Sequence, residues 1–594
     1  MKWSGIRAFG AAALALSGGG FFASAEEGPY DYAAEQEFWA FRAVESRKLP
    51  PVTDHSWPRS RMDHFVLAKL EEKGLAPNPG ADTRILLRRV SFDLTGLPPD
   101  WEDLADLSYE EQIDRLLASP HFGERWARLW LDVARYAEDQ AHIVGNNTAL
   151  TYPNAFHFRD WVISAFNRDL PYDEFLRQQL AADLIDASDE TMQFALGFMG
   201  LGPKYYRRGD LAVMADEWED RVDTLTRGVL GLTVSCARCH DHFYDPIPTS
   251  DYYALAGVFA STEMFNRPMS GECEEDKQGN AKKPEEAFHL VREAKEPRDL
   301  PVFERGDAAA PGEVVPRGFL TVLGAGERVT FTGADSGRLD LAEEIVSPRN
   351  PLTARVWVNR VWGELFGRPL VTTTSNFGKL GEEPSHPALL DDLSHRFMTE
   401  GDWSLKWLVR EIVLSSTYRQ SSERTGKKFE ADPGNTWIGR MSRRRLPVEM
   451  WRDALVVAGG ALDRSVGGPS FEASDPEANR RAVYARISRL QLDPMLALFD
   501  FPDPNLHSPG RSETTTPIQK LFVMNHPLVV DRSDRFAARL EGDPGEAVEA
   551  AYRILFGREP IQEERELGIA FLSRHDRALY AQALLASNEF AWLD

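Results

Sequence analysis

Two cysteines and a histidine lie within five residues of one another in the middle of the chain. The segment reads Cys236-Ala237-Arg238-Cys239-His240. This spacing is the attachment signature of c-type haem, in which two thiols form thioether bonds to the porphyrin vinyl groups and the next histidine ligates the iron. The sequence therefore predicts haem c as the cofactor, with Cys236 and Cys239 as attachment residues and His240 as the axial iron ligand.

Three other interpretations of the cysteine pair stay open at the level of sequence. A chance pairing is disfavoured because the chain has only three cysteines. A structural zinc site would recruit His242 as well, but tetrahedral zinc normally takes its ligand pairs from separate segments. A disulfide or thioredoxin-like redox pair normally lies in a βαβ setting, which the flanking sequence does not indicate.

A second axial ligand is not identified by the sequence. Residues of suitable type in the surrounding region are His142, His157, His242, Met199 and Met214. His242 follows His240 by two positions and is expected to point sideways rather than across the ring. A methionine ligand would raise the reduction potential relative to histidine, and an open position would permit binding of a small molecule.

The first 25 residues predict export from the cytoplasm. Lys2 and Arg7 give a positive start, an apolar stretch follows, and residues 23–25 (Ala-Ser-Ala) form an A-x-A cleavage site. Glycines 18–20 interrupt the apolar stretch, which is shorter than the roughly 20 residues of a membrane span. We therefore expect a periplasmic, secreted or cell-surface protein, with no integral membrane span after signal removal. Export also brings the chain to a compartment where c-type haems are attached.

Length and charge restrict the architecture and the partners. With 594 residues, 43% of them hydrophobic, the chain can bury several cores and is expected to form at least two large domains. Its 92 acidic residues against 68 basic ones give a net charge of −24. Such a field repels phosphate, so neither nucleic acid nor an anionic membrane surface is expected as a partner. A redox partner protein with a basic surface would suit this charge.

Helical periodicity dominates the first half of the chain. Apolar residues recur at three- and four-residue steps over residues 61–74, 84–96 and 123–139. Glycines at 74 and 96 are plausible helix stops. Residues 266–316 change to Glu, Lys, Pro, Gly and Ala with few large apolar side chains, which predicts a linker. Cys273 lies there among carboxylates, as expected for a solvated free thiol.

The second half is again mostly helical, and it completes a mainly α fold. Helices are predicted at 339–347, 351–366, 386–400, 404–414, 447–459 and 578–587, and a short strand at 481–489. We predict two large helical domains joined by a short irregular or β-containing linker. The predicted divisions are a signal peptide at 1–25, a haem domain at 26–265, a linker at 266–316 and a second helical domain at 317–594.

Polar residues inside apolar helices are expected to form internal ion pairs. Arg135 follows Asp132 within one helical turn, and a pair between Arg135 and either Asp223 or Asp132 is the default, because buried charges need partners. Asp500, Asp503 and Asn505 could bind a cation or act as acid and base, but the neighbouring Pro502 and Pro504 make them equally good turn residues.

The sequence around the cysteine pair resembles a known family. Residues 226–242, continuing through 245–248 and 251–259, resemble the planctomycete cytochrome-c-like domain family, whose function is unknown. Further similar segments are 88–99, 130–137, 159–162 and 167–173. The second half is similar to the planctomycete-specific domain that commonly follows it, over residues 350–362, 376–378, 415–420, 499–505, 514–519 and 552–558. The resemblance implies a haem and an exported location, and it implies no particular reaction.

Three hypotheses of function follow. In the first, the protein is an exported c-type haem protein that transfers electrons. In the second, it is a haem-linked oxidoreductase whose second domain oxidises a polysaccharide-derived substrate. This hypothesis rests on analogy with exported proteins of polymer-degrading bacteria. In the third, it is a non-catalytic surface or assembly protein. Haem content separates the third from the other two.

Overall fold

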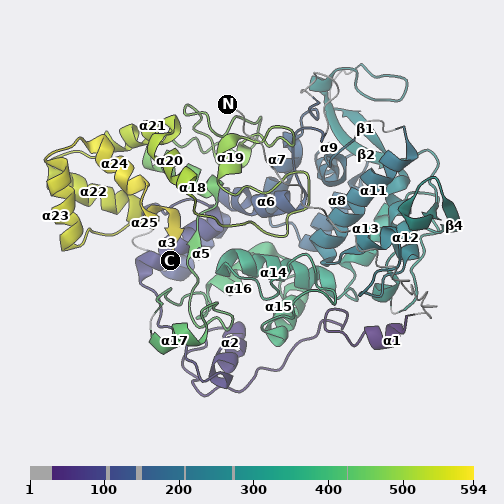
Figure 1. Cartoon of the computed structure of the whole chain (residues 1–594), viewed down its shortest axis with the longest axis horizontal. Coiled ribbons are helices and arrows are strands. Elements are labelled where there is room, and N and C mark those ends of the chain that lie inside the picture. Colours follow the sequence, from purple (N-terminus) through teal and green to yellow (C-terminus); the bar gives the residue numbers. More distant parts are fainter. Residues whose placement is uncertain are drawn as a thin grey trace, which may run out of the picture.

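The computed structural model describes residues 30–101, 107–141, 150–205, 209–269, 274–324, 326–424 and 426–594. The predicted signal peptide, His142 and Cys273 lie outside these ranges. The fold is mainly helical, with small two-stranded sheets around residues 262–315 between the helical regions (Figure 1). The predicted fold class is therefore confirmed.

The helices of the first half include the three predicted ones, and those predicted at 61–74 and 84–96 begin and end within two residues of their predicted bounds. They are α1 (Tyr32–Glu35), α2 (Arg61–Glu72), α3 (Thr83–Thr95), α5 (Tyr109–Ala118), α6 (His121–Val133), α7 (Phe156–Asn167), α8 (Tyr172–Ile185), α9 (Glu190–Gln193), α10 (Gly197–Gly200), α11 (Leu211–Leu225) and α12 (Thr249–Ala260). Helix α3 shows the local causes: the Asp82 carboxylate accepts from the Arg84 N–H at its start, and Gly96 takes the left-handed conformation (φ 70°) at its end.

Helix α6 ends at Val133, six residues before the predicted end at 139. Arg135 adopts a positive φ of 47°, which no helix continues through. Its guanidinium instead binds the Asp220 carboxylate of α11, with Nη2 2.5 Å from Oδ2. A tertiary ion pair, rather than helix propensity, therefore decides where this helix stops.

Between the halves lie four strands in two antiparallel pairs. Strand β1 (Thr262–Pro268) pairs with β2 (Ala287–Glu293), and β3 (Leu300–Phe303) pairs with β4 (Pro311–Val315). Strand β2 buries Ala287, Phe288, Leu290 and Val291. The sheets are therefore packed against the helical core.

The helices of the second half include the six predicted ones, whose observed bounds agree with the predicted bounds to within two residues at each end. They are α13 (Arg338–Val346), α14 (Leu352–Phe366), α15 (Pro387–Thr399), α16 (Leu405–Val413), α17 (Gly426–Ala431), α18 (Val448–Ala458), α19 (Pro494–Leu498), α20 (Pro517–Asn525), α21 (Pro527–Ala537), α22 (Pro544–Phe556), α23 (Gln562–Leu572), α24 (Arg577–Leu585) and α25 (Asn588–Ala591). Of these, α17, α19, α20, α21, α22, α23 and α25 were not predicted. The last strands, β5 (Arg444–Arg445) and β6 (Trp592–Leu593), pair with each other.

The strand predicted at 481–489 is wrong. The segment instead holds a 3₁₀ turn, η7 (Ala482–Tyr484), and a single bridge between Ala485 and Phe471. Carboxylates take the backbone donors that a neighbouring strand would need: the Ala482 N–H donates to Asp453 at 2.7 Å, and the Arg489 N–H donates to Asp139 at 2.7 Å. The alternation of apolar and polar residues over 481–489 therefore belongs to an irregular segment that is buried on both sides, not to a strand.

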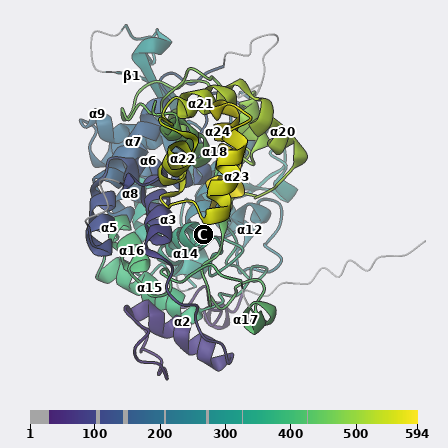
Figure 2. The ribbon, with the colours of Figure 1, turned by 90° about the vertical axis from the view of Figure 1, so that its left-hand side faces the viewer.

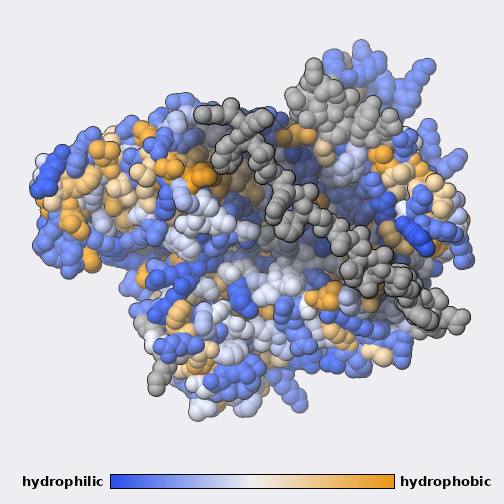
Figure 3. Space-filling view, in the orientation of Figure 1, coloured by the Kyte–Doolittle hydropathy of each residue, from blue (hydrophilic) through white to orange (hydrophobic). Residues whose placement is uncertain are grey.

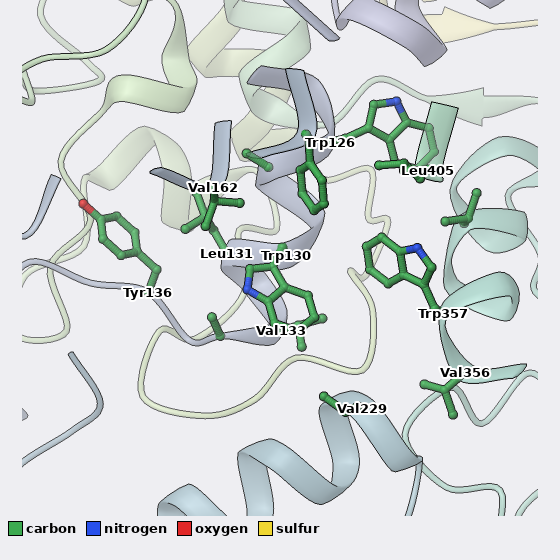
Figure 4. Close-up of a cluster of buried hydrophobic side chains, with 14 of the residues drawn as sticks. Trp126, Trp130, Leu131, Val133, Tyr136, Val162, Val229, Val356, Trp357 and Leu405 are labelled. Atoms are coloured by element: carbon green, nitrogen blue, oxygen red, sulfur yellow. The ribbon is translucent and has the colours of Figure 1, made fainter. Parts of the chain in front are cut away.

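The two halves share one continuous hydrophobic core. Figure 4 shows Trp126, Trp130 and Val133 of α6 beside Trp357 of α14, with Val229 below them. The Trp130 and Trp357 rings meet edge to face, with centroids 6.0 Å apart. Both tryptophans are fully buried. The helices on either side of the strands are thus packed together directly.

The molecule is elongated, as two views at right angles show. Figure 1 places α22, α23 and α24 at one end and the mid-chain strands with α12 at the other, and Figure 2 looks onto the C-terminal helices. The face seen in Figure 3 is mostly hydrophilic, with apolar residues gathered at the end where Figure 1 places α22, α23 and α24. Exposed apolar residues of the C-terminal helices include Ile518, Leu521 and Met524 of α20 and Leu567 of α23. In the described part of the chain no helix is long and apolar enough to cross a membrane.

We expect Arg338 to be essential for the docking of the strands. Its side chain is fully buried, and Nη2 lies 2.8 Å from Asp183 of α8 and 2.6 Å from Glu293 of β2. Arg338→Ala would leave two carboxylates without their cation and should lower the free energy of unfolding by about 3–5 kcal/mol. Urea denaturation measures this loss. Arg349→Ala is the control, because that side chain is 82% exposed; equal effects of the two substitutions would contradict the prediction.

Candidate functional site

The predicted attachment residues lie in a tight 3₁₀ turn. This turn, η3 (Val234–Arg238), contains Cys236, and Cys239 follows directly at its end. In a 3₁₀ turn side chains three positions apart lie on the same side. Both cysteines are exposed, and both thiols are free. The turn therefore presents two thiols together to the surroundings.

The next residue, His240, is also exposed, and one contact determines its tautomer. Its Nδ1 lies 2.7 Å from the carbonyl oxygen of Asp241. Because a carbonyl oxygen only accepts, Nδ1 is the donor, and in the neutral imidazole Nε2 is the nitrogen that keeps its lone pair. A hydrogen bond of this kind on the second ring nitrogen is the usual support of a metal-ligating histidine.

Two exposed aromatic residues lie next to His240. The Phe243 ring centroid is 4.1 Å from that of His240, and the Phe243 side chain is 78% exposed. Tyr244 is 53% exposed. A single exposed apolar residue is ordinary in a soluble protein. Two consecutive exposed aromatic residues close to a histidine, however, offer an apolar surface on which a flat ring can pack.

Helix α11 and the second sheet hold the turn in place. Arg238 forms ion pairs with Asp216, at 2.8 Å, and with Glu219, both on α11. Gly306, between β3 and β4, adopts a φ of 77°, and a Cβ there would come within 2.6 Å of the Cys239 sulfur. The mid-chain segment thus lies directly against the motif.

His242 supports the loop that follows the motif. Its Nδ1 accepts the Asp245 N–H at 2.8 Å, and its Nε2 lies 3.0 Å from the Thr233 hydroxyl. Burial lowers the pKa of His242. Both ring nitrogens of His242 therefore form hydrogen bonds within the loop. This leaves neither nitrogen available as a second axial ligand or as a ligand of the alternative zinc site. Among the described residues no group of three or more Cys, His, Asp or Glu is arranged to hold a metal ion.

Helix α11 packs against η3 through Asp216, Glu219 and Asp223. Met214 lies on the same helix two positions before Asp216, which places it on the other side of α11. Met199 is buried in the core, and His157 stacks on Phe194 with centroids 4.5 Å apart.

The family comparisons agree with the two halves of the fold. Residues 61–264 match PSCyt2, described as a protein of unknown function (DUF1549), and residues 337–572 match PSD1, described in the same words (DUF1553). The chain carries a PSCyt2 region followed by a PSD1 region. PSCyt2 is a planctomycete cytochrome-c-like family of unknown function. No match was found among curated proteins or among solved structures.

A cavity of about 410 Å³ lies where the PSCyt2 and PSD1 regions meet. The PSCyt2 region contributes the end of α3 and one face of α6, and the PSD1 region contributes α14, β5, α18, η7 and the loop at 508–513. Figure 1 shows α6, α14 and α18 around the middle of the molecule. The charged residues that line the cavity are Asp93, Glu124, Arg125, Arg128, Asp132, Arg360, Glu364, Arg444, Arg445, Glu449, Asp453, Arg481, Arg511 and Glu513.

Arg135 forms an internal ion pair, as predicted, but the predicted partners are wrong. Arg135 binds Asp220 rather than Asp132 or Asp223. Asp132 instead binds Arg128 at 2.8 Å and Arg511 at 2.7 Å. Arg511 comes from the PSD1 region, far away in sequence, so no local pattern could have indicated it.

Of the residues considered for cation binding, Asp503 and Asn505 form a local turn, whereas Asp500 binds a segment fourteen residues away. The carboxylate of Asp503 accepts the backbone N–H of Asn505 at 2.9 Å. That of Asp500 accepts the N–H of Thr514 at 2.9 Å and its hydroxyl at 2.7 Å.

Arg360 of α14 is held at the cavity by a buried polar group. Its Nη2 donates to the Ser375 hydroxyl oxygen at 3.0 Å. The Ser375 hydroxyl lies 2.7 Å from Nε2 of His507, and Nδ1 of His507 donates to the Val133 carbonyl at 3.1 Å. Because Nδ1 carries the proton, Nε2 accepts from Ser375. Burial and the nearby Arg360 lower the pKa of His507 to about 3, so the imidazole is neutral.

A continuous set of contacts joins this group to the cysteine pair. Arg360 donates from Nη2 to the backbone carbonyl of Arg227 at 3.2 Å. The Arg227 side chain binds Asp223, and Asp223 also accepts the Ser235 hydroxyl at 2.9 Å. Ser235 directly precedes Cys236. Arg227 lies in a π-helical turn, η2 (Thr226–Leu230), a rare element that occurs frequently at functional sites.

We expect His507 to make stability pH-dependent in one direction. Its pKa is about 3 when folded and about 6.5 when unfolded, so the neutral form stabilises the fold fully above pH 6.5, and this contribution is lost as the pH falls toward 3. Between pH 8 and pH 5 the wild type should lose about 1–2 kcal/mol more unfolding free energy than His507→Gln. Chemical denaturation at both pH values measures this; equal losses would refute it.

Proposed function

We propose that the protein is an exported c-type haem protein that transfers electrons. Cys236 and Cys239 would form the thioether bonds, and Nε2 of His240 would ligate the iron. The single observation that supports this most is the hydrogen bond from Nδ1 of His240 to the Asp241 carbonyl, which leaves Nε2 as the nitrogen available to a metal, next in sequence to two free thiols. When bound, a c-type haem supplies one-electron transfer at its iron.

The surroundings of the motif suit this assignment. Phe243 and Tyr244 offer apolar surface next to His240, and α11 presents Asp216 and Glu219 close by through their ion pairs with Arg238. With a net charge of −24, the protein would attract a redox partner with a basic surface. Export, which the first 25 residues predict, would bring the chain to its haem-attachment machinery.

A haem-linked oxidoreductase is a second candidate, and one specific observation favours it. The cavity between the PSCyt2 and PSD1 regions connects to the motif through Arg360, Arg227, Asp223 and Ser235. In this proposal the cavity would hold a polysaccharide-derived substrate, and electrons would leave through the motif to the partner protein. Addition of glucose, galactose or glucuronate to the oxidised protein, followed by absorption spectroscopy, tests it. Reduction of the iron by one of these sugars would support it, and the absence of reduction by all three would count against it.

We expect covalent haem in the wild type only. The full chain, expressed with a haem-maturation system, should keep its haem through acid-acetone extraction and give a c-type pyridine haemochrome spectrum. Cys236→Ala/Cys239→Ala should lose the band, because no thioether bond can form. Cys273→Ala is the matched control, since it removes the third cysteine outside the motif, and it should keep the band. A wild type without bound haem would end the proposal and leave the pair as a thiol site.

A further inference from the structure

We infer that the cavity between the two regions is a binding site for a small organic or inorganic anion that carries a carboxylate, sulfate or phosphate group. The site is separate from the cysteine motif, and the inference does not rest on the presence of haem. A volume of about 410 Å³ lies in the range of small-molecule sites and is too small for a folded partner.

Most charges in the cavity wall neutralise one another. Arg444 pairs with Asp93 at 2.7 Å, and Arg125 pairs with Glu364 at 2.8 Å. Arg481 binds both Glu124 and Asp453. Arg511 binds both Asp132 and Glu449. Most of these pairs join the PSCyt2 region to the PSD1 region, and together they occupy every lining carboxylate except Glu513. Burial raises the pKa of Glu513, which disfavours its charged form.

Arg360 differs from these residues because it forms no ion pair with a carboxylate among the described residues. Its side chain is 4% exposed, and its acceptors are the Arg227 carbonyl, the Ser375 hydroxyl and, at 3.5 Å each, the Pro509 carbonyl and Nε2 of His507. Burial lowers its pKa to about 10, which still leaves it charged at neutral pH. A buried cation without a counter-ion is costly, and a bound anion would compensate it.

The unpaired atoms of the wall are all donors. Among the lining residues, the buried side-chain atoms without a hydrogen-bond partner are the Nε atoms of Arg125, Arg360 and Arg444. No buried carboxylate oxygen of the lining lacks a partner among the described residues. A ligand that completes this wall must therefore bring acceptors. Guanidinium groups are the preferred partners of carboxylate and phosphate, which favours an anion over a neutral polyol.

Arg445 provides a second cation at the cavity. Its side chain is 16% exposed, its nearest carboxylate is Asp500 at 3.7 Å, and its Nη1 donates to the Thr514 carbonyl and to Gln519 at 3.3 Å. The donors on its other nitrogens are the ones it has to offer a ligand. Because the whole chain carries −24, the long-range field repels anions. The affinity would come from contacts inside the cavity.

Isothermal titration calorimetry of the full chain with sodium acetate, sulfate and phosphate, at one ionic strength set with sodium chloride, tests the inference. We expect at least one of these anions to bind the wild type at a single site. Its dissociation constant should rise about tenfold or more in Arg360→Gln and in Arg445→Gln, since each loses a charge-assisted contact. The anion that binds best identifies the carboxylate, sulfate or phosphate class.

Arg443→Gln is the matched control. Arg443 directly precedes Arg444 and Arg445, which both line the cavity. Its own side chain does not line the cavity: it is 47% exposed and pairs with Asp594. This variant should bind as the wild type does. If Arg360→Gln does not fold, Arg445→Gln decides the outcome. Failure of all three anions to bind the wild type, or equal affinities in the wild type and the cavity variants, would overturn the inference, whatever the haem content.

Discussion

The buried ion pairs between arginines of one region and carboxylates of the other are the constraint on which the rest of the structure depends. Arg444 with Asp93, Arg481 with Glu124 and Arg511 with Asp132 each join residues more than 300 positions apart. A buried arginine left without its carboxylate is strongly destabilising, so these contacts determine how the helices of the PSCyt2 and PSD1 regions face each other. The shared tryptophan core supplies the apolar attraction, and the ion pairs select one arrangement of it.

This arrangement gives the two candidate sites different characters. The cysteine motif lies on the surface, where a tight turn exposes two thiols and an imidazole. The cavity lies inside, where both regions contribute its wall and neither could form it alone. A site composed of both regions gives a physical reason for the two families to follow one another in a single chain. The π-helical turn η2 is in contact with both candidate sites. The Arg227 carbonyl accepts from Arg360 at the cavity, and the Arg227 side chain donates to Asp223 beside the cysteine motif.

Much of the local structure could be predicted from the sequence, because it depends on interactions between near neighbours. Helices such as α3 and α14 follow apolar periodicity with a glycine stop, so their bounds were predicted to within one residue. The prediction failed where distant residues intervened. Arg135 ends α6 early by binding Asp220, and Asp453 and Asp139 take the backbone donors of the segment predicted as a strand.

The sequence by itself determined the fold class, the family order and the C-x-x-C-H motif, since periodicity and residue spacing are carried by short segments. Only the tertiary structure decided the tautomer of His240, the commitment of His242 to its loop and the partners of the buried arginines. It alone showed the cavity, whose lining residues are scattered from Asp93 to Leu593. The role of a buried charged side chain depends on the groups packed around it. Those groups come from distant segments of the chain, so no local sequence pattern identifies them.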